Sequence, residues 1–277
     1  PTVRLVDIFR QAQESQIVMA AHQVNSGQKI DVGARRGAPN TPQERAKDKT
    51  KNGGQGRLFV IQKSDAEAVV DLICKMTAER IPQRFRLDPL DDVQILCPMK
   101  NGVLGTGNLN NRLRELLNPS AAGAYHDGSK RPTLRPGDKV MQIVNNYDKE
   151  VFNGDIGRVI SQDPRAGKLM VQFEDRQALY DRSEQSQLQL SYACTIHKSQ
   201  GSEYPAVIVP LHTKHFIMLQ RNLLYTAITR AKELCVLIGE ERAIWTAIRN
   251  ASIRRRYTRL HQRLQDLRAV RLKGADL

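Results

Sequence analysis

Short runs of consecutive apolar residues recur along the chain and alternate with stretches in which apolar residues follow a helical spacing. Continuous apolar runs of this length predict strands buried on both faces of a parallel sheet; they lie at residues 58–61, 93–97, 206–211 and 234–238. Between them, apolar side chains three and four positions apart predict helices that cover the sheet. These side chains are Ile17, Val18, Ala21 and Val24, then Val69, Val70, Ile73 and Met76, then Leu109, Leu113, Leu116 and Leu117, and finally Leu223, Leu224, Ala227 and Ile228. The predicted fold class is α/β.

Local signals set the expected helix boundaries. Ser15 is placed to cap the first helix, and Gly27 is expected to end it. The sequence Ser-Asp-Ala-Glu at residues 64–67 is a capping-box pattern that begins the second helix, and Pro82 is expected to lie beyond its end.

The pattern changes between residues 135 and 190, where short alternating segments are separated by turn residues. Asn153-Gly154 is a strong hairpin signal. Four or five short strands in so small a span predict a small antiparallel barrel inserted into the α/β domain; the predicted strands are residues 139–145, 156–160, 169–173 and 188–192.

Composition points to a polyanionic partner. The 277 residues carry 43 Lys and Arg against 29 Asp and Glu, a net charge of +14. Such a balance favours nucleic acid first and an acidic membrane surface second. No apolar run approaches the roughly 18–20 residues that span a bilayer, so we expect no membrane segment.

The four cysteines are far apart and form no Cys-x-x-Cys pair, so we expect free thiols in a reducing compartment, the cytoplasm. Cys194 and His197 lack the two further ligands of a metal site, and none is predicted.

Two segments lack the pattern of a packed core. Residues 31–56 contain few large apolar side chains and predict a mobile surface loop. Residues 249–277 are expected to form a basic C-terminal helix, with nine basic residues against one acidic residue between positions 249 and 273. An apolar stripe would dock this helix, and its arginines would face DNA, a partner subunit or solvent; the stripe is Ile253, Tyr257, Leu260, Leu264 and Leu267.

A glycine-rich loop at residues 98–107 joins a predicted strand to a predicted helix. Free backbone N–H groups at a helix N-terminus attract anions, so Lys100, Gly105 and Thr106 are candidates for a DNA phosphate contact. The alternative is a plain tight turn. The loop has no Gly-Lys-Ser/Thr, and the reversed pattern at residues 123–130 has no strand before it and Arg131-Pro132 after it, so neither is a Walker A loop.

Two polar segments adjoin the last two apolar runs. Ligands of open α/β sheets bind at the carboxyl ends of the strands, and we expect both segments to cluster there. Arg230 and Lys232 precede residues 234–238, and the other segment, before residues 206–211, comprises Thr195, His197, Lys198, Gln200, Gly201 and Glu203.

The sequences His-Lys-Ser-Gln-Gly-Ser-Glu at residues 197–203 and Tyr-Thr-Ala-Ile-Thr-Arg-Ala at residues 225–231 resemble the last two motifs of superfamily-one helicases in their RecD-like form. The resemblance extends through most of the chain. It implies the second RecA-like domain, with helices on both faces of its P-loop-NTPase-type parallel sheet, and an SH3-like β-barrel inserted in it. The expected division is residues 1–134 and 191–248 for the RecA-like domain, 135–190 for the barrel and 249–277 for the C-terminal helix.

The resemblance also implies roles for individual residues. Arg10 and Arg230 would reach the γ-phosphate of ATP, and Gln11, Gly201 and Glu203 would lie near the nucleotide. ATP and Mg²⁺ would be held mainly by the first RecA-like domain, which carries the Walker A and B motifs and would lie upstream. DNA binding or coupling would fall to Thr195, His197, Lys198 and Gln200, and to Asn145, Asn146 and Tyr147. Tyr147 either stacks on a base or packs in the barrel.

The implied function is the C-terminal motor half of an ATP-dependent 5′-to-3′ DNA helicase, inactive for hydrolysis by itself. Its partners would be single-stranded DNA, the upstream domain and other repair or recombination proteins, with no membrane. Two alternatives are a nucleic-acid-binding module without an ATP role and an accessory subunit that supplies arginines to a separate ATPase.

Overall fold

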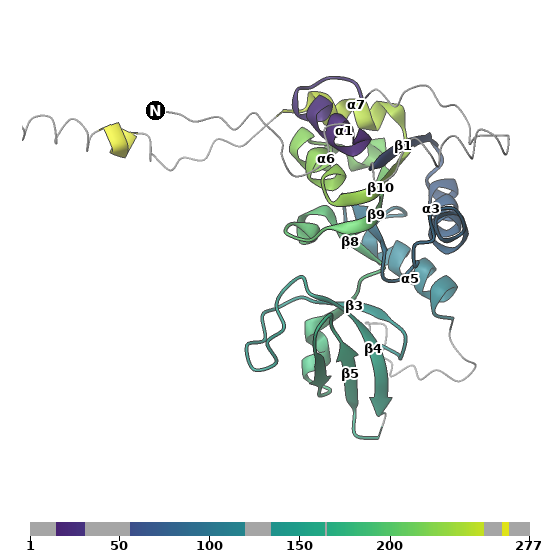
Figure 1. Cartoon of the computed structure of the whole chain (residues 1–277), viewed down its shortest axis with the longest axis vertical. Helices are drawn as coiled ribbons and strands as arrows, with labels where there is room; N and C mark the ends of the chain where they lie inside the picture. The colour runs from purple at the N-terminus through teal and green to yellow at the C-terminus, as the bar shows by residue number, and fades with distance from the viewer. Residues whose placement is uncertain (1–14, 31–55, 120–133, 164, 252–261, 266–277) are drawn as a thin grey trace, which may run out of the picture.

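The protein was examined as a computed structural model, which describes residues 15–30, 56–119, 134–163, 165–251 and 262–265. Figure 1 shows an α/β core with a smaller β-domain below it. Arg10, Gln11, the reversed glycine pattern and nearly all of the expected loop at residues 31–56 lie outside the described residues.

The core is built on a five-stranded sheet in the order β1-β10-β9-β2-β8. Every neighbouring pair is parallel, and every residue of β2 is buried, which explains the continuous apolar runs. The α/β prediction is confirmed. The strands are β1 (Arg57–Gln62), β2 (Val93–Cys97), β8 (Ala193–Thr195), β9 (Tyr204–Leu211) and β10 (Ala231–Gly239).

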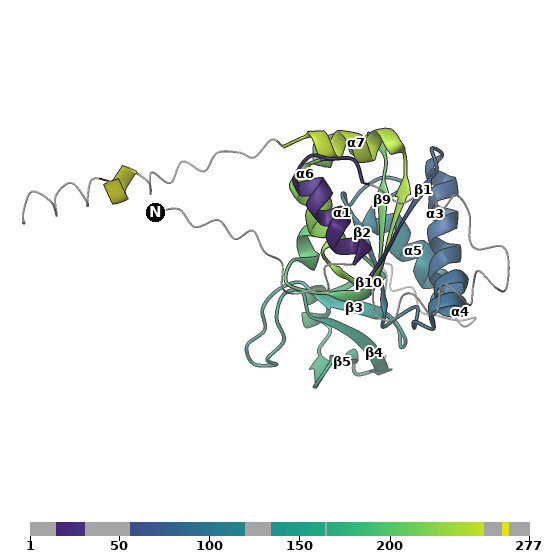
Figure 2. The ribbon, with the colours of Figure 1, turned by 45° about the horizontal axis from the view of Figure 1, so that its top comes forward.

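Helices cover both faces of this sheet (Figure 2). On one face Ile95, Ile208 and Val236 share a core cluster with α3 (Ala66–Lys75) and α5 (Thr106–Leu117). On the other face Val207 and Leu237 join the buried side chains of α1 (Gln16–Asn25), α6 (Arg221–Ile228) and α7 (Glu241–Arg249). The alternation follows the two-residue period of a strand.

Helix boundaries differ from the predictions in three places. Ser15 occupies the N-cap position of α1, but its hydroxyl makes no capping bond. Asp65 caps α3 by accepting from Ala68 N at 2.7 Å. Pro82 lies beyond α3, as predicted, but helical structure does not stop before it. A π-helix at Met76–Arg80 follows α3 directly, and Pro82 lies in the first turn of α4 (Ile81–Phe85). Leu116 of α5 faces solvent, with 47% of its surface exposed.

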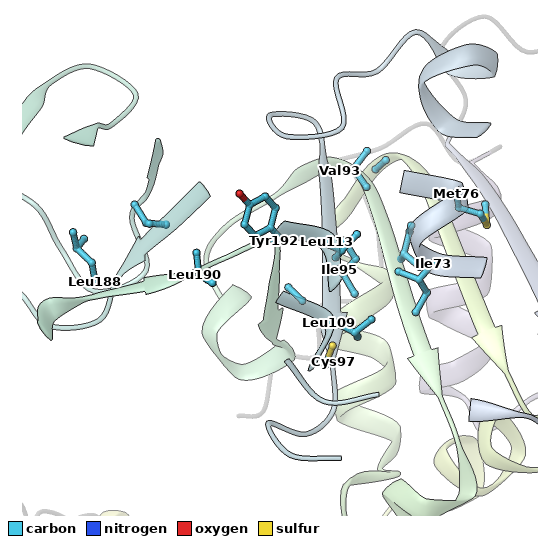
Figure 3. Packing of buried hydrophobic residues seen from close by; sticks show 14 of the residues in the cluster. Ile73, Met76, Val93, Ile95, Cys97, Leu109, Leu113, Leu188, Leu190 and Tyr192 are labelled. Atoms are coloured by element: carbon cyan, nitrogen blue, oxygen red, sulfur yellow. The ribbon is translucent and has the colours of Figure 1, made fainter. Parts of the chain in front are cut away.

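The second sheet is antiparallel, in the order β6-β5-β4-β3-β7, and confirms the predicted small barrel with one strand, β6, that the sequence pattern did not indicate. Its apolar interior continues into the core: in Figure 3, Leu188, Leu190 and Tyr192 follow one another from the barrel toward Val93 and Ile95, and all five belong to one cluster. The strands are β3 (Lys139–Gln142), β4 (Ile156–Asp163), β5 (Lys168–Gln172), β6 (Gln177–Tyr180) and β7 (Leu188–Leu190), with a 3₁₀ turn at Glu184–Gln187.

The hairpin between β3 and β4 turns at residues 147–150 and not at Asn153-Gly154. Glu150 has a positive φ of 53° and its N–H donates to Tyr147 O at 3.2 Å, while Asn146 and Val151 pair as an antiparallel bridge. Gly154, with φ of 107°, belongs to a second turn just before β4. The turn signal was therefore real but located the wrong bend.

The described residues at 262–265 are helical, and Leu264 is 57% exposed, so the predicted docking of an apolar stripe is not seen at this position. All four cysteines are free thiols, as predicted, and Cys97, Cys194 and Cys235 are buried. Burial raises the pKa of the Cys235 thiol to about 12. In the described ranges no helix has the length and apolar character needed to cross a membrane.

Candidate functional site: a segment that runs from one edge of the sheet to the other

The polar residues at 195–203 connect the carboxyl end of β8 to the amino end of β9. They leave the carboxyl end of β8, where Thr195 pairs with Cys97, form the 3₁₀ helix Ile196–Ser199, and reach the amino end of β9 at Tyr204. Ser199 is buried and its hydroxyl donates to Ile196 O at 2.8 Å, which holds the 3₁₀ turn.

This course corrects the expectation that both polar segments share the carboxyl edge. Glu203 immediately precedes β9 and Arg230 immediately precedes β10, so both lie at the amino ends of their strands, where Tyr204 pairs with Ala231. Only the first part of the segment, from Thr195 to Gln200, lies at the carboxyl end of β8. The site therefore has two ends, joined by one stretch of chain.

Two lysine side chains lie near one another at the carboxyl end of β8 and β2. Lys198 of the 3₁₀ helix and exposed Lys100 of the loop after β2 are close enough to repel one another. Partial burial, followed by this repulsion, lowers the pKa of Lys198. Among the described residues neither ammonium group forms an ion pair with a carboxylate. His197 and Gln200 beside them are exposed, and Thr195 is half-buried. Two neighbouring cations without an acidic partner favour an external anion.

The glycine-rich loop does not offer the free N–H groups that were predicted. Gly105 N donates to Gly102 O, Thr106 N to Met99 O and Gly107 N to Lys100 O, at 3.0, 3.2 and 3.2 Å. A Cβ at Gly105 would lie 2.4 Å from Lys100 O, so the glycine permits the tight turn itself. The alternative of a plain turn is the better description, and the loop contributes to the site through the Lys100 side chain.

The barrel presents an exposed aromatic pair at its hairpin. Tyr147 is 74% exposed and Phe152 43% exposed, with ring centroids 5.9 Å apart in an edge-to-face arrangement. Asn145 braces the pair, because its Oδ1 accepts from Asn153 N at 2.9 Å and its amide donates to the Tyr147 hydroxyl at 3.4 Å. Exposure of this degree rules out the alternative that Tyr147 packs in the barrel.

The hairpin lies beside the lysine end of the segment, since a Cβ at Gly154 would be 4.0 Å from Lys198 O. Asn146 faces another neighbour and donates to Gln187 Oε1 at 3.1 Å. Phe152 was not among the predicted site residues; an aromatic residue placed directly before Asn153-Gly154, where a turn brings it to the surface, was the available signal.

Arg230 lies at the amino ends of β9 and β10. Its Nη1 donates to Ser202 O at 2.9 Å and its Nη2 to Thr229 Oγ1 at 3.4 Å, while its buried Nε finds no acceptor among the described residues. Glu203 next to it is exposed. Gly201 adopts φ of 93°, and a Cβ there would meet no atom within 4 Å, so its glycine is required by the backbone conformation and not by crowding.

The described residues bring together no group of three or more His, Cys, Asp or Glu side chains of the kind that holds a metal ion. They do supply one partly bonded guanidinium and one exposed carboxylate at the amino end. The guanidinium suits a phosphate group approached from outside the chain, whereas the carboxylate can only accept hydrogen bonds.

Two regions match known families. Residues 190–238 match the family described as the UvrD-like helicase C-terminal domain, and residues 109–173 match the ATP-dependent RecD-like DNA helicase SH3 domain. The first match contains the whole segment and Arg230, and the second contains β3, β4 and the aromatic hairpin.

Two curated relatives agree with these matches. The ATP-dependent RecD2 DNA helicase of Deinococcus radiodurans is 33% identical over 269 residues, which cover 97% of this chain and 32% of that protein. The RecBCD enzyme subunit RecD of Mycolicibacterium smegmatis is 29% identical over 187 residues, covering 66% of this chain and 31% of that protein. Among solved structures, a chain from a study of two coordinating Pif1 helicases at forked double-stranded DNA aligns with a TM-score of 0.45 and 16% identity over 97% of this chain and 54% of its own.

The fold and the matched regions define the second RecA-like domain of a superfamily-one helicase, with an SH3-like insertion. The chain spans about a third of the length of these curated relatives. Within the superfamily, the chain belongs to the RecD-like helicases, of which it represents the C-terminal part.

Proposed function

We propose that this chain is the C-terminal motor half of an ATP-dependent DNA helicase that moves 5′ to 3′ on single-stranded DNA. One observation carries the proposal: residues 195–203 connect the paired lysines at one edge of the sheet to Arg230 at the other edge, through the Ser202 carbonyl. A displacement of residues 195–200 would therefore shift the Ser202 carbonyl and with it the Arg230 guanidinium. Such a link is what a motor needs between a DNA site and a nucleotide site.

Arg230 is assigned to the γ-phosphate. ATP supplies the phosphoryl group that water attacks, and a guanidinium next to it stabilises the charge that develops, an effect worth about 10³–10⁵ in rate in phosphoryl-transfer enzymes. The unpaired Nε and the long Nη2 contact show that the group has bonding capacity to spare. We assign Arg10 to the same phosphate, and Glu203, Gly201 and Gln11 to the neighbourhood of the nucleotide.

The Walker A and B residues and the Mg²⁺ ligands are assigned to a first RecA-like domain. Hydrolysis by this chain alone is expected to be absent.

The DNA strand is assigned to the face formed by Lys100, Lys198 and the aromatic pair. Lysine side chains neutralise backbone phosphates, and an exposed aromatic ring is a platform on which a base stacks. Asn145 orients Tyr147 for this role. Thr195, His197 and Gln200, together with Asn146, are assigned to DNA binding or to coupling along the segment. Gly105 and Thr106 shape the loop that presents Lys100.

The names of the relatives suggest the setting. One is a subunit of the RecBCD enzyme, so other repair or recombination proteins are proposed as partners, and the free thiols fit a cytoplasmic location.

The DNA assignment is tested by the salt dependence of binding. Fluorescence anisotropy would follow a labelled 20-nucleotide oligo(dT) with the 277-residue chain between low and moderate salt. For single strands the slope of log K against log salt changes by about 0.7 for each phosphate contact. Lys100→Ala and Lys198→Ala should each reduce the slope by about this amount, whereas Lys168→Ala, at the exposed start of β5, should not. A slope near zero for the unaltered chain would remove the DNA assignment.

The motor assignment is tested by hydrolysis. DNA-stimulated ATP hydrolysis would be measured for the 277-residue chain with and without the upstream domain of a RecD-like helicase. Activity only in the mixture supports a motor half. Activity of the chain alone would reveal a nucleotide site that the proposal lacks, and DNA binding without any hydrolysis in the mixture would favour a nucleic-acid-binding module.

A further inference from the structure

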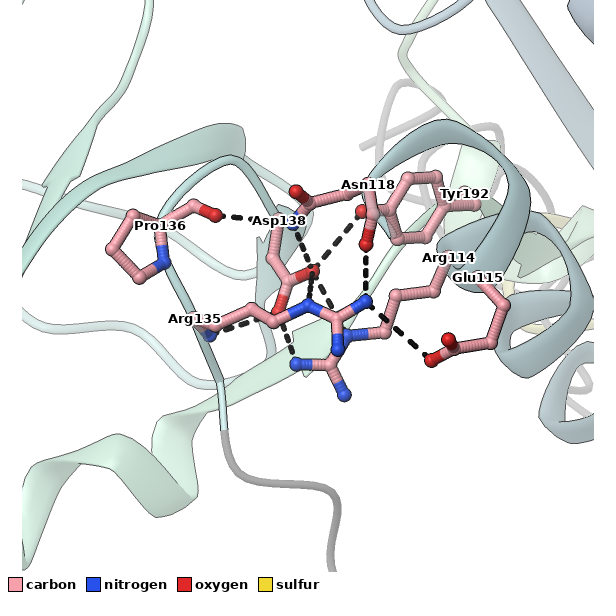
Figure 4. Close-up of polar contacts among 7 residues, drawn as sticks. All are labelled: Arg114, Glu115, Asn118, Arg135, Pro136, Asp138 and Tyr192. Atoms are coloured by element: carbon pink, nitrogen blue, oxygen red, sulfur yellow. Dashed lines mark hydrogen bonds and ion pairs between the residues drawn. The ribbon is translucent and has the colours of Figure 1, made fainter. Parts of the chain in front are cut away.

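The chain passes between the α/β core and the barrel twice. It enters the barrel just before β3 and returns to the core between β7 and β8. Both crossings lie next to the C-terminal part of α5, and a single side chain, Asp138, lies where they meet (Figure 4).

The Asp138 carboxylate is fully buried and accepts five hydrogen bonds. Arg114 binds it through Nε at 2.9 Å and Nη2 at 2.6 Å, and Asn118 Nδ2 donates at 2.9 Å. The Arg135 backbone N–H donates at 2.9 Å and the Tyr192 hydroxyl at 3.1 Å. Nearby Asp138, together with burial as the larger cause, raises the pKa of Tyr192.

These donors come from three different parts of the molecule. Arg114 belongs to α5 of the core and Asn118 is the C-cap residue of that helix, whereas Arg135 lies on the incoming crossing and Tyr192 on the outgoing one. The Arg135 guanidinium adds bonds of its own to the Asn118 carbonyl and to Glu115. One carboxylate therefore ties both crossings to the same helix.

Elsewhere the seam between core and barrel contains the shared apolar cluster and a buried hydrogen bond from Lys139 Nζ to Val93 O at 3.1 Å. Opposite the crossings, Arg158 of β4 meets Asp91 at 3.2 Å in an exposed pair. Asp91 and Arg158 also line a cleft of about 660 Å³. Its walls come from both the core and the barrel and include Leu90, Lys139, Ile156, Phe173 and Tyr204. The bonds at the crossings are buried, whereas this part of the seam has an exposed ion pair and a cleft. We therefore expect the barrel to tilt relative to the core if the bonds at the crossings are lost.

We propose that Asp138 is a positioning residue that holds the aromatic pair of the barrel in register with Lys198 of the core. β3 begins at the residue after Asp138 and leads directly into the hairpin. The end of β3 is bonded to the base of the hairpin, because Gly154 N donates to Gln142 O and Gln142 N to Asp155 O, both at 2.9 Å. The direction of β3 at Asp138 thus sets the place of Tyr147 and Phe152.

The expected benefit is pre-organisation of two DNA-contacting patches. When two patches are held rigidly at the correct spacing, binding at one makes binding at the other intramolecular, and no ordering cost is incurred at that moment. This inference rests on the proposed DNA-binding function. Its first test uses no DNA, so the two can fail separately.

The first test measures the distance between core and barrel. Spin labels would be placed through Glu67→Cys on α3 and Lys168→Cys on β5, both exposed sites, in a Cys74→Ser background that leaves the three buried thiols in place. Double electron–electron resonance should give a narrow distance distribution for the parent. We expect Asp138→Asn to broaden it, and Tyr192→Phe, which removes one donor and leaves the ion pair, to broaden it less.

Two controls separate positioning from stability. Arg158→Ala breaks the exposed pair across the same seam and should leave the distribution narrow. Leu237→Ala opens a cavity in β10, away from the junction, and should lower stability without broadening the distribution. If Asp138→Asn does not fold, Tyr192→Phe and Asn118→Ala carry the test.

The second test measures DNA affinity and its salt slope together. Loss of one of the donors should weaken oligo(dT) binding about fivefold, and Asp138→Asn should weaken it further. The salt slope should stay at the parent value, because the lysines still reach the phosphates. A distance distribution that stays narrow in Asp138→Asn and Tyr192→Phe would overturn the proposal, and so would a fall in affinity matched by an equal fall in salt slope.

Discussion

Arg114 and Arg230 are both at least partly buried and are bonded in opposite ways. Arg114, with 8% of its side chain exposed, makes a bidentate pair with the fully buried Asp138. Arg230, at the amino ends of β9 and β10, donates to the Ser202 carbonyl and, at the longer distance of 3.4 Å, to the hydroxyl of the adjacent Thr229. Its buried Nε has no acceptor among the described residues.

The difference separates architecture from function. A buried charge that is fully paired contributes to a unique arrangement of the chain and costs much to disrupt from one side only. A buried donor left without a partner carries a desolvation cost that the fold does not recover, and at Arg230 we expect a ligand to complete the bonding. Arg114 is expected to matter for stability and Arg230 for catalysis, and substitutions at each position test this division.

The largest effect is expected at Arg230. In a protein that also contains the upstream domain, Arg230→Ala should reduce DNA-stimulated ATP hydrolysis by about 10³-fold or more, because the charge next to the γ-phosphate is lost. The midpoint of thermal unfolding should change little. Lys232→Ala, which removes an exposed cation two residues further on, is the matched control. Hydrolysis that survives in Arg230→Ala would show that the arginine does not reach the phosphate.

A large stability effect is expected at the other arginine's partner. Asp138→Asn leaves Arg114 buried without its counter-charge and should lower the free energy of unfolding by about 3–5 kcal/mol, measured by urea denaturation followed by circular dichroism. Asp91→Asn breaks the exposed pair with Arg158 on the other side of the seam and should cost less than about 1 kcal/mol. Equal costs for the two variants would mean that the junction is not organised around Asp138.

The comparison extends to His215, a second buried group with an unpaired nitrogen. Its Nδ1 has no partner among the described residues, and burial, followed by repulsion from His212, lowers its pKa to about 4. His215 takes up a proton near pH 6.5 in the unfolded chain but only near pH 4 in the folded chain. Protonation between these pH values therefore favours the unfolded state, and the free energy of unfolding falls as pH decreases from about 6.5 to about 4. A shift of this size corresponds to about 3 kcal/mol.

His215→Phe keeps a ring in the same place without a titrating group. Urea unfolding at several pH values should show a smaller loss of stability on acidification in this variant than in the parent, by about 3 kcal/mol across the window. His22→Ala, which removes an exposed histidine from the last turn of α1, should lose stability as the parent does. An unchanged acid profile in His215→Phe would contradict the assignment.

The smallest effect is expected at the barrel hairpin. Tyr147→Ala should weaken oligo(dT) binding by about 1–3 kcal/mol, the usual contribution of one stacked base, with no measurable change in unfolding. Tyr180→Phe is the internal comparison, because this buried tyrosine donates to Gln142 Oε1 at 3.0 Å and should affect stability and not binding. Full DNA affinity in Tyr147→Ala would move the strand away from the hairpin.

The parts that the sequence predicted well are those set by local pattern. The apolar runs at residues 93–97 and 206–211 are strands buried on both faces, and a run of consecutive apolar residues has no other use in a sheet covered by helices on both sides. The helical stripe of Val69, Val70 and Ile73 is fully buried for the same kind of reason. The positions of Glu203 and Arg230 just before two strands were also visible.

Two of the features that the sequence analysis missed depend on contacts within a short stretch of chain, and a third depends on distant partners. The glycine-rich loop has the composition of an anion site, yet its N–H groups are taken by carbonyls of the same loop. The hairpin turns three residues before Asn153-Gly154, because Asn146 and Val151 pair as an antiparallel bridge around residues 147–150. Asp138 carries no local signal at all, since its donors come from residues 114, 118 and 192 as well as from its neighbour.

The sequence by itself determined four of the five strands of each sheet, the helices that cover the first sheet, and the motif residues that mark the chain as RecD-like. Period, turn chemistry and motif spacing are properties of neighbouring residues. The short strands β6 and β8 were not predicted. The tertiary structure alone decided that the polar segment spans both edges of the sheet, that Tyr147 faces solvent, and that one carboxylate joins the barrel to the core. Each of these depends on which distant groups meet, and the free energy of such a meeting is set by burial and bonding that no local pattern contains.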